Sequence, residues 1–452
     1  MLTESATGTT PIHPVTRDDF ETWLEQADAD IRDWARASGF EGEAGRHLLV
    51  PDGQGGVSSV LVGHEEHERI WALASLPGQL PAGDYHLAGD WSDEEGIRAS
   101  VGWLLGAYRF DRYKSMPAPQ ARLTVKPEWR QQAEVLAGAA SRVRDLVNTP
   151  AIDLGPEELA GALESLAERF NADYYCYEGE ELKREFPAVH AVGQAASRGP
   201  RLARLSWGNP DHPSLALVGK GVVFDSGGLN IKPGAGMVLM KKDMGGAAHV
   251  IGLAEIIMSL GLKVHLRVYV PAVENAIAGN AYRPSDIIRT RNGTTVEIGN
   301  TDAEGRVILS DALSLACEEG AERVIDFATL TGAARVALGE DLPPVYGRDQ
   351  AALRQLQDLS FSEEDPLWHM PLYKPYKRQI QPALADLSNT GTTPQGGSLT
   401  AALFLDHFVA ADRDWMHLDI YAWNLSDRPG RPAGGEAQGL RAVWAWLRRV
   451  YD

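Results

Sequence analysis

Residues 245–270 read GGAAHVIGLAEIIMSLGLKVHLRVYV and combine an apolar helix with a strand. The first part, Gly245–Leu262, is apolar apart from His249 and Glu255, so we interpret it as a helix of the protein core and not as a membrane span. Between positions 264 and 270, apolar residues alternate with His, Arg and Tyr, the period of two that is typical of a strand with one buried face. A core helix that leads directly into a strand indicates an α/β fold.

The flanking sequence continues this alternation. Apolar residues lie on one face of a predicted helix over residues 157–170. Short apolar runs predict further strands at Ala172–Tyr177, Leu215–Val218, Val324–Ala328 and Trp415–Tyr421. We therefore expect a larger C-terminal α/β domain with a mixed, mostly parallel sheet that is flanked by helices.

The chain of 452 residues exceeds the usual size of a single core, so two domains are expected. Residues 18–113 mix helical patterns with short apolar strands, and a stretch with three prolines follows up to Pro127. We predict a smaller N-terminal α/β domain over 1–127, with residues 1–17 as a flexible tail. A helix over 128–148 is expected to link it to the larger domain, residues 149–452.

The charge and the cysteine content exclude several classes of protein. A net charge of −19 argues against nucleic acid or an anionic membrane as the main partner. Only Cys176 and Cys317 are present, which excludes a disulfide framework and a Cys/His zinc cluster, and we expect both thiols to be buried. Because the first 17 residues lack the apolar region of a signal peptide, a cytoplasmic location is expected.

Two segments place charged residues among glycines: GKGVVFDSGG at 219–228, which continues to Gly246, and NTDAEGR at 300–306. They contain four carboxylates, whose charge two divalent cations would balance: Asp225, Asp243, Asp302 and Glu304. Ligation by oxygen alone suits Mn²⁺, Mg²⁺ or, less typically, Zn²⁺. Two adjacent metal ions are a known device for hydrolysis, so the pattern favours a hydrolytic metal site.

Spacing and helix capping bear on this interpretation. Lys220 and Asp225 are an odd number of residues apart, so Gly221 or a β-bulge must bring them to one side of the strand. Alternatively, Thr301 and Glu304 fit a helix capping box and Asp243 fits an N-cap. Capping explains neither the lysines at 220 and 232 nor the glycine pairs, so we favour the metal site.

The segment Asn300–Arg306 resembles the signature of the leucyl aminopeptidase (cytosol aminopeptidase) family. The likeness extends over residues 140–410 and includes Val218–Gly246, Asn275–Pro284, Ala328–Ala333 and Asp386–Phe404. It implies a metal-dependent aminopeptidase that releases Leu-like N-terminal residues from peptides, that assembles as a homo-hexamer, and whose catalytic domain is residues 149–452.

The resemblance also implies the parts of the site. One metal ion, Mn²⁺ or Zn²⁺, would be bound by Lys220, Asp225, Asp243 and Glu304, and a second by Asp225, Asp302 and Glu304. Lys232 and Arg306 would be the catalytic cations, with a bicarbonate held by Arg306 as the base. Met240, Thr329 and Gly332 match the family positions that line the side-chain pocket.

Three alternatives concern other residues or another class of protein. Asp225-Ser226-Gly227-Gly228 is similar to the nucleophile loop of serine peptidases, but no His has a matching context, and His249 is expected at the surface or facing a partner. For His417 and Asp419 we favour a hydrogen-bonded structural role over a further metal site. A non-catalytic scaffold or DNA-binding protein is disfavoured by the acidic charge, and metal content would discriminate it.

Overall fold

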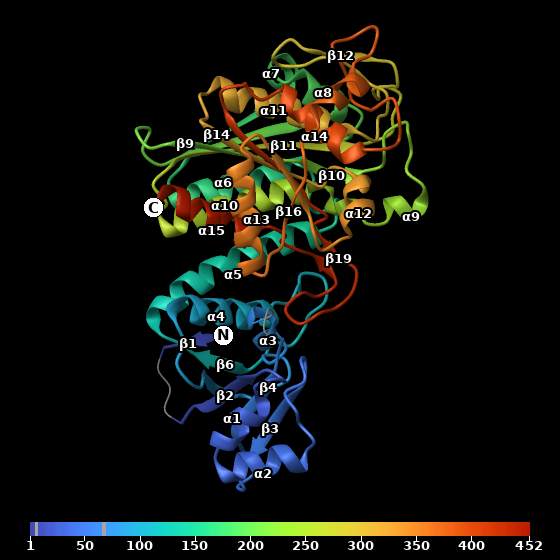
Figure 1. Cartoon of the computed structure of the whole chain (residues 1–452). Coiled ribbons are helices and arrows are strands. Elements are labelled where there is room, and N and C mark those ends of the chain that lie inside the picture. The colour runs from blue at the N-terminus through green and yellow to red at the C-terminus, as the bar shows by residue number, and fades with distance from the viewer. Residues whose placement is uncertain (5–7, 66–68) are drawn as a thin grey trace. The chain divides into compact units, whose positions relative to one another are not determined.

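The computed structural model describes residues 1–4, 8–65 and 69–452, and the chain divides into two compact units (Figure 1). One unit comprises Met1–Ser141 with Asn424–Ala433, and the other comprises Arg142–Trp423 with Gly434–Asp452. The chain passes from the first unit to the second within helix α5 (Pro127–Asn148).

The first unit is built on a six-stranded sheet in the order β1-β6-β5-β2-β4-β3, in which only β3 and β4 pair antiparallel among the described residues. The strands are β1 (Leu2–Thr3), β2 (Thr10–Val15), β3 (His47–Pro51), β4 (Val57–Gly63), β5 (Gly83–Leu87) and β6 (Ala121–Thr124). The helices are α1 (Phe20–Gln26), α2 (Ala29–Ala37), α3 (Arg69–Ala74) and α4 (Asp93–Ala107). β1 and β2 lie within residues 1–17, where a flexible tail is expected, and residues 5–7 of that segment lie outside the described residues.

A nine-stranded sheet forms the centre of the second unit, in the order β16-β15-β18-β14-β9-β11-β8-β7, with β10 also paired to β11. Its strands are β7 (Asp173–Glu178), β8 (Arg201–Trp207), β9 (Ser214–Gly219), β10 (Gly221–Asp225), β11 (His265–Asn275), β14 (Arg323–Ala328), β15 (Pro344–Gly347), β16 (Trp368–His369) and β18 (Asp414–Asp419). β14 pairs in parallel with β18 and β9, and β11 pairs in parallel with β9 and β10. In contrast, β8 pairs antiparallel with β7 and β11, and β15 pairs antiparallel with β18. This confirms the predicted mixed, mostly parallel sheet. A separate small sheet is formed by β12 (Ile287–Arg289), β13 (Thr295–Glu297) and β17 (Leu387–Ser388).

Helices cover both faces of the large sheet (Figure 1). One face carries α6 (Pro156–Phe170), α10 (Gly245–Leu260) and α15 (Leu440–Tyr451), and the other carries α8 (Pro187–Gly193), α11 (Glu304–Glu318) and α14 (Gly397–His407). The remaining helices are α7 (Gly179–Glu185), α9 (Gly234–Met237), α12 (Gly332–Leu338), α13 (Gln350–Ser362), and the 3₁₀ segments η1 (Met240–Met244) and η2 (Lys374–Ile380).

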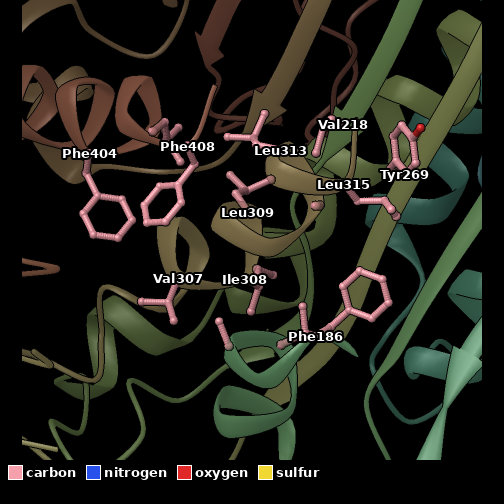
Figure 2. Packing of buried hydrophobic residues seen from close by; sticks show 14 of the residues in the cluster. Phe186, Val218, Tyr269, Val307, Ile308, Leu309, Leu313, Leu315, Phe404 and Phe408 are labelled. Atoms are coloured by element: carbon pink, nitrogen blue, oxygen red, sulfur yellow. The ribbon is translucent and has the colours of Figure 1, made fainter. Parts of the chain in front are cut away.

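The core between the sheet and the α8, α11 and α14 layer is closely packed (Figure 2). Val218 and Tyr269 project from the sheet, Leu309 comes from α11, and Phe404 comes from α14. All four side chains are completely buried. Aliphatic and aromatic groups of this size contribute about 1.5–3 kcal/mol each when fully buried, so this layer stabilises the helix that begins at Glu304.

On the opposite face, α10 is the apolar helix that the sequence predicts. The segment Gly234–Leu260 has the length and composition of a membrane span, but 89% of its most apolar window is buried, as expected for a core helix. The prediction that His249 lies at the surface is wrong, because its exposed fraction is 0%. Its Nδ1 lies 2.6 Å from the Gly245 carbonyl oxygen and its Nε2 accepts a hydrogen bond from the Gln438 backbone N–H, while burial lowers its pKa to about 4.

The start of α10 approaches β14 so closely that only glycine fits at position 246. A Cβ atom on Gly246 would lie 2.0 Å from the Phe327 carbonyl oxygen. We expect Gly246→Ala to lower the free energy of unfolding by at least about 2 kcal/mol, because two backbone segments would have to separate. Denaturant unfolding monitored by circular dichroism measures this change.

Gly161→Ala is the matched control, because a Cβ there meets nothing within 4 Å and Gly161 lies inside helix α6. The control is expected to raise stability by about 0.5–1 kcal/mol. Similar unfolding midpoints for the two variants would contradict the close approach.

Candidate active site

Two short strands in succession bring Lys220 and Asp225 to the same site. β9 and β10 both pair in parallel with β11, and Lys220 is the single residue between them. The register of β10 shifts between Val222 and Phe224, which is the irregularity that the odd spacing of Lys220 and Asp225 requires. The predicted bulge is therefore confirmed, and both side chains line one cavity.

The remaining carboxylates lie close to the starts of helices α10 and α11. Asp243 lies in η1, Asp302 precedes α11, and Glu304 is the first residue of α11. The capping alternatives are wrong: the N-caps of α10 and α11 are Met244 and Ala303, and neither makes a side-chain capping bond.

Thr301 does not cap a helix but connects the two charged segments by hydrogen bonds. Its hydroxyl donates a hydrogen bond to the Gly227 carbonyl oxygen (2.6 Å) and accepts one from the Asn230 backbone N–H (2.8 Å). This contact fixes the loop after β10 against the loop before α11.

Two lysines lie among the four carboxylates. The Lys220 ammonium is 2.7 Å from Asp243 Oδ2 and 2.8 Å from Glu304 Oε1, and it donates to the Thr329 carbonyl oxygen at 2.9 Å. Although burial alone lowers it, the pKa of Lys220 is raised well above its ordinary value by these carboxylates. Lys232 makes the same kind of contact with the other two carboxylates: its ammonium is 2.8 Å from Asp225 Oδ2 and 2.6 Å from Asp302 Oδ1.

Three carboxylates lie close enough to share an ion. Oxygen atoms of Asp225, Asp302 and Glu304 lie within 4.8 Å of one another. Burial and the neighbouring Asp225 charge raise the pKa of Glu304 to about 8, and the same causes raise the pKa of Asp302. Glu304 Oε2 is buried and has no hydrogen-bond partner among the described residues. This donor set, with a buried oxygen unpaired, fits divalent cations.

Neutral groups hold the carboxylates in place. The Asn275 side-chain amide and the Gly227 backbone N–H both donate to Asp225 Oδ1, at 2.8 Å and 2.9 Å. The Thr329 hydroxyl donates to Asp243 Oδ1 at 2.8 Å. Such contacts orient metal ligands in other proteins and tune their basicity.

Arg306 lies in the first turn of α11, two residues after Glu304. Its Nη1 donates to the Asn389 carbonyl oxygen at 2.8 Å, and its Nε has no partner among the described residues. Burial lowers its pKa to about 10. Arg306 is not among the described residues that line the cavity.

A cavity of about 90 Å³ is lined by the charged cluster and by residues that follow β14. Every other predicted site residue lines it: Lys220, Asp225, Lys232, Met240, Asp243, Asp302, Glu304, Thr329 and Gly332. Sequence reasoning missed Lys242, Arg335, Glu340 and Tyr421, which line the same cavity. The position of Lys242 between Met240 and Asp243 is the one signal in the sequence that pointed there.

Two alternatives from the sequence can be judged from the hydrogen bonds. The Ser226 hydroxyl donates to the Asn275 carbonyl oxygen, and in the described part of the chain no histidine contacts it, so a catalytic triad is not assembled. His417 is buried with its Nδ1 2.5 Å from Asp326 Oδ1, which confirms a structural role. Asp419 accepts hydrogen bonds from the Leu330 and Thr331 backbone N–H groups and fixes the loop after β14.

The model of the cytosol aminopeptidase family catalytic domain matches residues 141–444, and the M17 aminopeptidase N-terminal domain matches residues 10–126. A probable cytosol aminopeptidase from Syntrophotalea carbinolica is 42% identical over 76% of this chain and 72% of its own length.

Solved structures agree with these matches. The crystal structure of a cytosol aminopeptidase from Coxiella burnetii has a TM-score of 0.96 and 46% identity, covering 100% of this chain and 99% of the other. The bottromycin maturation enzyme BotP in complex with Mn has a TM-score of 0.89 and 31% identity, covering 99% and 100%.

The fold and the site define an aminopeptidase, a hydrolase with an α/β catalytic domain. The chain belongs to the cytosol aminopeptidase (M17) family, which confirms the resemblance drawn from Asn300–Arg306.

Proposed function

We propose that the chain is a metal-dependent aminopeptidase that releases Leu-like residues from peptides with a free N-terminus. The observation that carries this proposal is the convergence of Asp225, Asp302 and Glu304 within 4.8 Å, with a buried Glu304 oxygen left unpaired. The Mn bound by the related BotP supports Mn²⁺ as one suitable ion. Zn²⁺ stays a prediction from the family resemblance.

Two divalent ions would be held by the residues that the family resemblance assigns. Asp225 and Glu304 would contact both ions, Asp243 and a neutral Lys220 would complete the first site, and Asp302 the second. When bound, divalent cations polarise a carbonyl oxygen and lower the pKa of water, which is the chemistry that peptide hydrolysis needs.

The cations of this chain would act on the charges that develop in the substrate. The Lys232 ammonium lies between Asp225 and Asp302, so it can donate to the substrate carbonyl oxygen as negative charge develops there. Arg306, whose Nε is unpaired among the described residues, would hold a bicarbonate that accepts the proton of the attacking water.

The residues at the two ends of the cavity would determine which substrates bind. Met240, Thr329 and Gly332 line the part that would receive an apolar side chain. Carboxylates and their ions at the other end would hold the α-amine, which requires an unblocked N-terminus. A homo-hexamer stays a prediction from the family resemblance, and light scattering of the purified protein measures it.

We expect Leu-p-nitroanilide to be hydrolysed only when Mn²⁺ or Zn²⁺ is returned to chelator-treated protein. N-acetyl-Leu-p-nitroanilide is the matched control and is expected to stay intact, because its amine is blocked. Hydrolysis of both compounds, or hydrolysis that persists in excess chelator, would contradict the proposed function. Metal binding without hydrolysis of any peptide would favour a non-catalytic protein.

A further inference from the structure

A second cavity lies in the first unit, and the proposed function makes no use of it. Its volume of about 340 Å³ is within the range of about 300–1,000 Å³ that is typical of small-molecule sites. Its wall includes Thr16, His64 and Asp90, which follow strands β2, β4 and β5. These strands are neighbours in the sheet and pair in parallel, so their carboxyl ends meet at this cavity.

The chain leaves β2 and β5 toward opposite faces of the sheet. Helix α1, which follows β2, packs on the face that carries His13 and Leu61. Helix α4, which follows β5, packs on the face that carries Tyr85, where the Trp103 ring lies against it. Tyr85 pairs with Thr10, three residues before His13, so the two faces are opposite. Open α/β sheets bind ligands in the crevice that such a change of direction leaves between two strand ends.

The wall of this cavity is acidic and aromatic. None of the described residues in it is a lysine or an arginine, whereas three carboxylates and two indole rings line it: Asp19, Asp90, Glu95, Trp23 and Trp91. Asp19 and Asp90 form no ion pair with another described residue. The Trp91 ring is held by a hydrogen bond of 2.9 Å from its Nε1 to a backbone carbonyl oxygen. Carboxylates supply the counter-charge for a cation, and the face of an indole ring attracts one.

A nucleotide, which is a common ligand of such crevices, is disfavoured here. Helix α4 begins at the cavity, but its first turn is satisfied by its own side chains. The Ser92 hydroxyl accepts a hydrogen bond from the Glu95 backbone N–H, and Glu95 Oε2 accepts one from the Ser92 backbone N–H at 3.2 Å. A carboxylate therefore already occupies the helix N-terminus at which a phosphate group would bind. His64 adds no free donor at its Nδ1, which lies 2.8 Å from the Glu65 carbonyl oxygen.

We propose that this cavity binds a small organic cation, an alkyl chain that ends in a guanidinium or ammonium group. Asp19 and Asp90 supply the counter-charge, and the alkyl chain lies against the indole rings of Trp23 and Trp91. The described residues of this wall belong to the first unit, whereas the carboxylate cluster belongs to the second. The inference goes beyond the proposed function and does not depend on it.

Calorimetric titration of the full-length protein in Mn²⁺ compares n-butylguanidinium with n-butylurea, which have nearly the same shape and differ in charge. We expect butylguanidinium to bind at one site per chain, at least about tenfold more tightly than butylurea, the size of one charge-assisted hydrogen bond. The double variant Asp19→Asn with Asp90→Asn should weaken butylguanidinium at least about fivefold and leave butylurea unchanged, because both acids are exposed. Trp91→Leu should weaken both compounds.

Asp111→Asn is the matched control, since Asp111 is an exposed acid of the same unit and lies outside the cavity. Its affinity for butylguanidinium should equal that of the wild type. The unfolding midpoints of the aspartate variants should also match the wild type, which shows that any loss of binding is local.

No saturable binding of butylguanidinium, or equal affinity for the two compounds, would overturn the inference. Binding that the double variant leaves unchanged would place the cation elsewhere, for example at the catalytic carboxylates, and would overturn it too. Binding of AMP in place of the cation would assign the cavity to nucleotides. Failure to hydrolyse Leu-p-nitroanilide would overturn the proposed function alone, because the two sites share no described residue.

Discussion

Glu304→Gln is expected to reduce kcat/KM for Leu-p-nitroanilide by more than about 100-fold, because loss of a residue that only supports a metal ligand already costs 10–100-fold. Gln keeps the size of the side chain but removes the charge that faces Asp225 and Asp302 at the centre of the cluster. It also removes one of the two carboxylates that contact Lys220. Metal content by mass spectrometry should fall below two ions per chain.

Glu322→Gln is the matched control for this change, since Glu322 is exposed and lies outside the cavity. The control should keep full activity and full metal content. Wild-type metal content together with wild-type activity in Glu304→Gln would show that Glu304 is not a ligand, and the assignment of the cluster would have to be withdrawn.

Lys232→Met should lower kcat by about 10²–10³, the usual cost of removing one donor to a developing oxyanion. Metal content should be retained, because the Lys232 ammonium competes with cations for Asp225 and Asp302 and its removal leaves both carboxylates in place. KM should change little, since the donor acts mainly in the transition state. Steady-state kinetics and metal analysis of the same sample measure these effects.

The exposed Lys263 provides the control, and Lys263→Met is expected to behave as the wild type. If Lys232→Met loses metal in proportion to activity, Lys232 is a positioning residue for the cluster and does not act on the substrate.

Periodicity in the sequence predicted those parts of the fold in which one face of a segment is buried. The alternation at 264–270 became β11, and the apolar run before it became α10. The same reasoning placed His249 at the surface because it lies off the most apolar face of α10. The Gln438 backbone, from a segment almost 190 residues later, covers that face, and no local pattern contains this contact. Cys176 and Cys317 were expected to be buried, but both are only half-buried free thiols.

At the site, the carboxylates could be predicted because their charges are concentrated between glycines in two short segments. Other parts of the cavity wall could not be predicted, since Lys242, Arg335 and Tyr421 come together only when η1, α12 and the segment after β18 meet. Lys242 stands out only after folding, because only the folded chain shows that it is buried and lines the cavity.

The bulge in β10 has a consequence for how the chain can vary in length. The direction of Lys220 and Asp225 does not depend on which side chains stand at positions 222 and 224, since the backbone shift there is what aligns the two residues. Position 221 is different, because a Cβ on Gly221 would lie 2.5 Å from the Pro271 carbonyl oxygen. Deleting or inserting one residue in this interval would turn Asp225 away from Asp302 and Glu304. Natural variation here should therefore consist of substitutions, with the number of residues between the lysine and the aspartate held constant.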